Sequence, residues 1–155
     1  MIHYRNDVRA SGIDARRVKR AARQLLSALG EAGSGLSISF VDDTAIRALN
    51  RRHRGKDKPT DVLSFPLAGA PLRRAQGDIA AGVERLLGDV VISVDTARRQ
   101  ASEYGADLQA EIERLLIYGL LHVMGHDHEE AEEARIMRVE ERRLADAIGM
   151  AWPYE

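Results

Sequence analysis

The chain has 155 residues, of which 45% are hydrophobic and 5% aromatic, and its formal net charge is −1. This length fits one compact domain, residues 1–155, with an aliphatic core large enough to need no covalent staple. The absence of cysteine excludes disulfides, thiolate metal sites and cysteine nucleophiles, and the near-neutral charge argues against a general nucleic-acid coat protein.

The first half of the chain predicts strands and helices in alternation. Apolar residues alternate strictly in "LSISFV" at 36–41 and recur at helical spacing before Gly30, which suits a helix end. Asp42 or Asp43 can cap a second helix that ends near Gly55. We therefore expect strands at 2–5, 36–41 and 61–67, and helices over 14–29 and 42–55.

The second half predicts mostly helix. Residues 68–87 form an irregular excursion rich in Ala, Gly and Arg, and "GDVVIS" then predicts a strand in which Asp89 lies at the start. We expect this strand at 88–93 and helices over 93–105, 107–125 and 129–148, the last with Met137, Leu144 and Ile148 buried. No repeat or linker divides this order, and the elements predict an α+β fold with helices packed on a small mixed sheet.

Targeting signals are not evident. No segment approaches the apolar length of a membrane span, and the first ten residues, "MIHYRNDVRA", lack the apolar region of a signal peptide. The sequence therefore predicts a cytoplasmic protein without a membrane partner.

Positive charge is concentrated in residues 47–58, "RALNRRHRGKDK". This segment carries six cations against Asp57 alone, namely Arg47, Arg51, Arg52, Arg54, Lys56 and Lys58. Acidic residues gather instead in 129–141. Two interpretations stay open, a nucleic-acid surface and a set of solvated helix faces in an arginine-rich chain.

The segment "YGLLHVMGHDH" at 118–128 has the spacing of a metal site. In the zinc pattern H-E-x-x-H-x-x-G-x-x-H, the ligand places here hold Tyr118, His122 and His128. Residues 118 and 122 lie one helical turn apart, and Gly125 allows the chain to bend back and bring His128 to the same ion. Two imidazoles, a third donor and an open position are the arrangement of a catalytic zinc site.

Two positions depart from that pattern. A phenol must lose its proton to coordinate, so Tyr118 binds as phenolate, His126 or Asp127 replaces it, or the site is weak or empty. The alternative without a metal is that Tyr118 packs in the core and the histidines end a helix. Gly119 stands where zincin proteases have their general base, which disfavours peptide hydrolysis. Asp127 could orient a histidine, assist proton transfer or cap the next helix, of which the first and third are favoured, whereas His126 should point elsewhere.

The histidine segment resembles the signature H-G-x-L-H-L-x-G-Y-D-H of the bacterial YbeY family, single-strand-specific endoribonucleases of rRNA maturation. "LNRRHRGKDKPTDVLSFP" at 49–66 and "LGDVVIS" at 87–93 are similar to that family's other hallmarks, in the same order. The resemblance implies a four-stranded mixed sheet with about five or six helices and a zincin-like metal cleft. It also implies one Zn²⁺ per chain on His122 and His128, with Tyr118 in the place of the first ligand.

The same resemblance implies a function. The substrate would be single-stranded rRNA, including the 3′ end of 16S rRNA, with the ribosomal small subunit or its assembly factors as partners. Arg54 and His122 would be catalytic, because a guanidinium can stabilise charge on a phosphate. The residues expected to bind RNA are Arg51, Arg52, Arg54, Lys56 and Lys58.

Several neighbouring residues suggest structural roles instead. Arg47 should point away from the RNA, Ser64 should satisfy a backbone group, and Thr60 and Asp61 should shape a turn. Two other functions stay open, a metal-dependent hydrolase of another substrate and a non-catalytic RNA-binding assembly factor with a degraded metal site.

Overall fold

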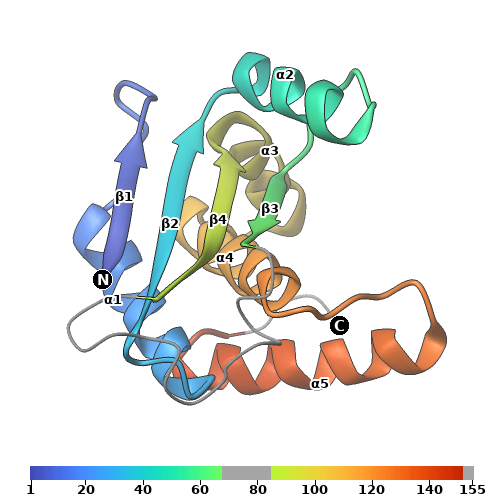
Figure 1. Cartoon of the computed structure of the whole chain (residues 1–155). Coiled ribbons are helices and arrows are strands. Elements are labelled where there is room, and N and C mark those ends of the chain that lie inside the picture. Colours follow the sequence, from blue (N-terminus) through green and yellow to red (C-terminus); the bar gives the residue numbers. More distant parts are fainter. Residues whose placement is uncertain (68–84, 152–155) are drawn as a thin grey trace.

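The computed structural model describes residues 1–67 and 85–151 and has the layered α+β architecture expected from the sequence (Figure 1). Four strands form one mixed sheet in the order β1-β2-β4-β3. β1, β2 and β4 pair in parallel, whereas β3 runs antiparallel to β4. The strands are β1 (Ile2–Asn6), β2 (Ser34–Val41), β3 (Val62–Pro66) and β4 (Arg85–Ser93).

The helices of the described residues are α1 (Ala15–Ala28), α2 (Asp43–Arg54), α3 (Val94–Tyr104), α4 (Leu108–Val123) and α5 (Ala131–Ala147). The first four begin where the sequence predicted. At each of their N-caps an Asp or Ser side chain accepts a hydrogen bond from a first-turn N–H and so fixes the start of the helix. In the part of the chain that the structure describes, no helix has both the length and the apolar character that crossing a bilayer requires.

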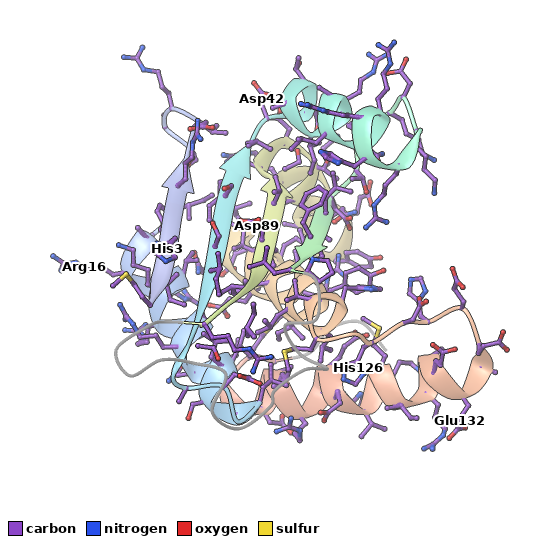
Figure 2. The ribbon with its side chains drawn as sticks, in the orientation of Figure 1. His3, Arg16, Asp42, Asp89, His126 and Glu132 are labelled. Carbon is purple, nitrogen blue, oxygen red and sulfur yellow. The ribbon has the colours of Figure 1, made fainter. Side chains whose placement is uncertain are left out.

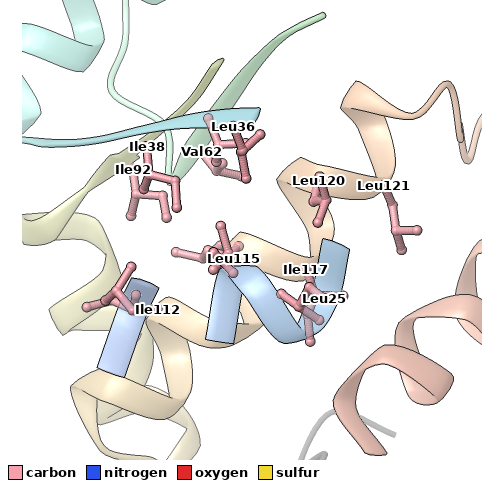
Figure 3. Close-up of a cluster of buried hydrophobic side chains, with 14 of the residues drawn as sticks. Leu25, Leu36, Ile38, Val62, Ile92, Ile112, Leu115, Ile117, Leu120 and Leu121 are labelled. Carbon is pink, nitrogen blue, oxygen red and sulfur yellow. The ribbon is translucent and has the colours of Figure 1, made fainter. Parts of the chain in front are cut away.

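α4 is the central helix of the core. Its buried side chains face the sheet on one side and α1 and α5 on the other, so the helix is apolar on most of its circumference. Figure 3 shows Ile112 and Leu115 of α4 among aliphatic side chains of the sheet and α1, which include Leu25, Leu36, Ile38, Val62 and Ile92. Burial of each such side chain stabilises the fold by roughly 1.5–3 kcal/mol.

Gly119 lets α4 approach the sheet closely. A Cβ atom at this position would lie 2.7 Å from Cγ1 of Val90 and 3.2 Å from Oγ of Ser64. The Ser64 hydroxyl donates a hydrogen bond of 2.9 Å to the Gly119 carbonyl, which is the structural role predicted for that serine. Gly119, which stands where zincin proteases have their catalytic glutamate, therefore faces the sheet. A glutamate side chain would not fit there.

α2 packs on the opposite face of the sheet. Ile46 of α2 forms a second, smaller core with Val41, Leu63 and Val91 of three strands. This contact fixes α2 across one end of the sheet (Figure 1). As a result, the last turn of α2 and the basic loop after it lie beside the start of β3.

Three predicted details are wrong at the ends of elements. β4 begins at Arg85 because β2 extends back to Ser34 and pairs with it, so Asp89 lies inside the strand rather than at its start (Figure 2). α5 begins at Ala131, two residues later than predicted, with no side-chain cap. Ile148 ends that helix half-buried against the core. The rest of the predicted excursion, 68–84, lies outside the described residues.

Candidate active site

The end of α4 brings the three predicted metal-binding residues together. Gly125 has a φ of +97°, and the His126 N–H donates to the Leu121 carbonyl at 2.9 Å, so the chain turns back on the helix. The ring of His128 then lies 5.5 Å from the His122 ring and 5.9 Å from the Tyr118 ring, between centroids. The ring centroids of Tyr118 and His122 are 4.5 Å apart.

The polar atoms of these rings lie close together. The Tyr118 hydroxyl is hydrogen-bonded to Nε2 of His128 at 2.8 Å. Nε2 of His122 is buried and has no hydrogen-bond partner, an arrangement that costs stability unless a ligand satisfies the nitrogen. Two imidazoles and a phenol are therefore positioned to bind one metal ion, which fits the zinc that the sequence predicts.

Tyr118 is the third polar side chain of the group formed with His122 and His128. Across residues 1–67 and 85–151, no three side chains of His, Cys, Asp and Glu gather so that they could hold a metal ion. His126 also lines the cleft, but it does not complete such a group with His122 and His128. Replacement of Tyr118 by His126 or Asp127 is therefore disfavoured.

Burial acts on the two helical rings in opposite ways. It raises the pKa of Tyr118, and the charges of Asp61 and Glu141 raise it further. It lowers the pKa of His122, as does neighbouring His128. His122 is thus kept in the neutral form that binds metals, whereas the Tyr118 phenol keeps its proton more firmly than usual.

Asp127 contacts the neighbouring residue His128. Its Oδ1 atom accepts a hydrogen bond of 2.7 Å from the His128 backbone N–H and lies 3.8 Å from Nδ1 of the same residue. The N-cap of α5 is Glu130, so Asp127 does not cap that helix. Of the roles predicted for Asp127, capping of α5 is therefore wrong, and the orientation of His128 stays a prediction.

A cleft of about 620 Å³ joins these rings to the basic loop. Tyr118, His122 and His128 line this cleft, and so do Arg54, Lys56, Lys58 and Asn50, here called its basic wall. Arg54 lies within electrostatic reach of the rings, because its positive charge acts to lower the pKa of both Tyr118 and His122.

The basic segment divides between two faces of α2. Asn50 and Arg54 are one turn apart and both face the cleft, whereas Arg51 and Arg52 are rotated away from it. Arg52 lines a separate groove of about 440 Å³ together with Arg5. Arg51 and Arg52 therefore lie outside the cleft that Arg54 lines, and their contact with RNA stays a prediction. Arg47 points away as predicted and pairs with Asp57 at 2.9 Å.

Two residues of the cleft were not identified from the sequence as parts of the site. Asn50 is buried, and its Nδ2 donates to the Lys58 carbonyl at 2.9 Å, which holds the basic loop against α2. Asp61 shapes the turn before β3 as predicted, with Oδ1 accepting from the Val62 N–H at 2.7 Å, but it also lines the cleft. A polar residue four positions before Arg54 was the available signal for Asn50.

Sequence comparison places this site in a known family. The family profile described as "Endoribonuclease YbeY" matches residues 3–149. The chain belongs to the YbeY endoribonuclease family. Two relatives named endoribonuclease YbeY, from Myxococcus xanthus and Carboxydothermus hydrogenoformans, are 50% and 44% identical over 88% and 86% of the chain. The family resemblance read from the sequence is thereby confirmed.

The coverage of these relatives differs. The chain spans 44% of the Myxococcus protein, 66% of a 48%-identical relative from an Anaeromyxobacter species, and 85% of the Carboxydothermus protein. Among solved structures, the solution structure of TM1509 from Thermotoga maritima matches with a TM-score of 0.64 at 22% identity, covering 96% of this chain and 89% of that one. This last match supports the fold.

Proposed function

We propose that this chain is a metal-dependent endoribonuclease for single-stranded RNA that acts in rRNA maturation. The observation that carries the proposal is the convergence of Tyr118, His122 and His128 on a cleft that Arg54 also lines. The proposal includes the 3′ end of 16S rRNA as a substrate and a role in ribosome quality control. It places the protein in the cytoplasm with the ribosomal small subunit or its assembly factors.

His122, His128 and Tyr118 would hold one Zn²⁺ per chain. The ion supplies Lewis acidity and water activation when bound. The chain itself supplies the geometry, since the Gly125 turn and Asp127 hold His128 beside the other two rings. Burial lowers the pKa of His122 and so favours the neutral ring, whose Nε2 has no hydrogen-bond partner and could coordinate the ion through its lone pair.

Arg54 would act on the phosphodiester. Its guanidinium can offer two parallel N–H donors to phosphate oxygens and stabilise the negative charge that develops during cleavage. Lys56 and Lys58 line the same wall and would bind the flanking backbone. The three rings line the same cleft as these cations, so a phosphate bound in it could meet both parts of the site.

A non-catalytic RNA-binding assembly factor is the second candidate. One observation favours it: Nε2 of His128, a proposed metal ligand, is occupied by the Tyr118 hydroxyl. A protein that retained this hydrogen bond would keep the basic wall and bind metal weakly. Hydrolysis of peptides is disfavoured, because Gly119 packs against the sheet where the protease pattern has its base.

The metal content of the purified protein and its cleavage of single-stranded rRNA fragments test the proposal together. We expect about one zinc per chain, cleavage that a chelator abolishes, and recovery on addition of zinc. RNA binding that persists in a protein without zinc or cleavage would favour the assembly factor. Absence of RNA binding as well would overturn both functions.

The matched pair Arg54→Ala and Arg51→Ala tests the role of Arg54. We expect Arg54→Ala to lower kcat by on the order of a hundredfold or more, with a smaller loss of RNA affinity, because its donors act where charge develops. Arg51 is exposed and outside the cleft, so Arg51→Ala should retain cleavage. Equal losses of kcat and affinity in Arg54→Ala would reduce Arg54 to a binding contact.

A further inference from the structure

Asp61 places a carboxylate in a cleft that is otherwise suited to phosphate. It lies directly before β3 and lines the same cleft as Arg54, Lys56 and Lys58, with 28% of its side chain exposed. A negative charge at this place repels a nucleic-acid backbone. The carboxylate therefore weakens phosphate binding unless it makes a favourable contact with another part of the ligand.

The carboxylate is held in place from behind. Its Oδ2 atom accepts a hydrogen bond of 3.2 Å from Nε2 of Gln100 on α3 and lies 3.9 Å from Nη2 of Arg114 on α4. Arg114 is fixed in turn by two hydrogen bonds, of 3.0 and 2.7 Å, to the fully buried carboxylate of Glu111. Groups on α3 and α4 thus fix the position of the Asp61 carboxylate.

Asp61 keeps capacity for a further donor. An ionised carboxylate accepts about four hydrogen bonds. The Val62 N–H and the Gln100 amide supply two, and the Thr60 hydroxyl lies at a longer distance of 3.4 Å. The side chain is partly exposed and the residue lines the cleft, so a donor on the ligand can reach it.

We infer that Asp61 accepts a hydrogen bond from the 2′-hydroxyl of a bound ribose and so favours RNA over DNA. This inference rests on the proposed function. Beside each phosphate of RNA, the 2′-hydroxyl is a donor that does not depend on the base, and DNA lacks it. A ribose bound beside the basic wall would place its phosphate near the cations and its hydroxyl near Asp61.

The affinities of single-stranded RNA and DNA of one sequence, measured with a chelator present to prevent cleavage, test the inference. We expect the wild type to prefer RNA by on the order of tenfold. Asp61→Ala should lose this preference through weaker RNA binding, whereas its DNA binding should stay equal or become tighter. RNAs with one 2′-deoxy nucleotide at each position in turn should then locate the hydroxyl that Asp61 binds.

Asp57→Ala is the matched control, because Asp57 pairs with Arg47 in the same loop and lies outside the cleft; its RNA preference should be unchanged. If Asp61→Ala unfolds at assay temperature, Gln100→Ala is the second variant. It keeps the Asp61 carboxylate but removes the hydrogen bond from Gln100, and it should lower the preference for RNA over DNA in part. Equal weakening of RNA and DNA binding in the Asp61 variant, or an equal effect in the Asp57 variant, would overturn the inference while leaving the nuclease intact. A wild type that binds no RNA would overturn both.

Discussion

Tyr118 differs from the two histidines beside it in the proton that it must lose before it can coordinate a metal. Burial raises the pKa of its phenol, and Asp61 and Glu141 add to this effect. The hydroxyl is also bonded to Nε2 of His128. Both features oppose metal binding, so the identity of residue 118 should control how tightly the chain binds zinc.

Substitutions at residue 118 test this control directly. We expect Tyr118→His to tighten zinc binding by roughly tenfold or more, because imidazole coordinates as a neutral group, and not to lower RNA cleavage. Tyr118→Phe should weaken zinc binding, since two imidazoles remain. Competition with a chromophoric chelator measures both affinities. Tighter binding in the Phe variant would contradict the prediction and show that the phenol competes with the metal for His128.

Individual residues of the site were predictable where the chemistry is local in sequence. The spacing of Tyr118, His122 and His128 around a glycine predicted that the three rings meet, and they do; their metal-binding role stays a prediction. The cleft-facing place of Asp61 was not predictable, because Gln100 and Arg114 fix it from distant helices. Arg51 and Arg52 were grouped with Arg54 because charge counting ignores the direction of a helical side chain.

At the scale of elements, the contact between β3, β4 and α4 depends on a glycine. A Cβ atom at Gly88 would lie 2.5 Å from the Phe65 carbonyl oxygen and 3.0 Å from the Pro66 Cα. Both neighbours are backbone atoms of the paired strand, so they cannot move aside as a side chain would. The hallmark segment "LGDVVIS" therefore carries a packing requirement in addition to any functional one.

Gly88→Ala tests that requirement. We expect the free energy of unfolding to fall by about 1–3 kcal/mol, the usual cost of overpacking a core. Urea titration followed by circular dichroism measures the change. Gly33→Ala is a suitable control, because an added Cβ there meets no atom within 4 Å. Equal stability of the Gly88 variant and the wild type would show that β3 can shift without cost.

The elements themselves were more predictable than their ends. Alternating and helical periodicities identified every strand and helix of the described residues, since each buries one face or, for α4, most of its surface. The start of β4 was missed because its pairing with Ser34 of β2 sets it, which is a long-range contact. The start of α5 was missed because the turn after Gly125 continues to Glu130 without a cap.

At the scale of the whole molecule, Asp43 connects three elements and makes stability depend on pH. Burial acts to raise the pKa of this carboxyl, but hydrogen bonds from Ser93, Thr96 and Arg99 outweigh it and leave the pKa lowered. A carboxyl with a lower pKa in the folded chain stabilises the fold above its unfolded pKa. That stabilising contribution is lost as the pH falls through the pKa that the carboxyl has in the folded chain.

Asp43→Asn should therefore flatten the acid side of the stability profile. We expect the variant to be less stable than the wild type at neutral pH and to lose less stability between about pH 5 and pH 2. Urea unfolding at a series of pH values measures this. Asp57→Asn should change the profile less, because its ion pair with Arg47 is exposed and such pairs contribute little. An unchanged acid slope in Asp43→Asn would assign the pH dependence to other carboxyls.

At the scale of the whole chain, the distribution of charge determines how many cationic side chains contact RNA. The segment 47–58 has a balance of six cations to one acid in sequence, but the cleft is lined by Arg54, Lys56 and Lys58. Each phosphate contact with a single strand adds about −0.7 to the slope of log affinity against log salt concentration, so three contacts predict a slope of roughly −2. Binding by all five predicted RNA-binding residues would give roughly −3.5.

Titration of a fluorescent single-stranded RNA at several salt concentrations separates these cases. Lys58→Ala should reduce the steepness of the slope by about 0.7, whereas Arg52→Ala, in its separate groove, should leave it unchanged. A wild-type slope near −3.5 that falls equally in both variants would mean that RNA wraps around α2 and contacts both of its faces. The cleft would then be one part of a larger surface, and the segregation of charge in the sequence would describe RNA binding better than the cleft does.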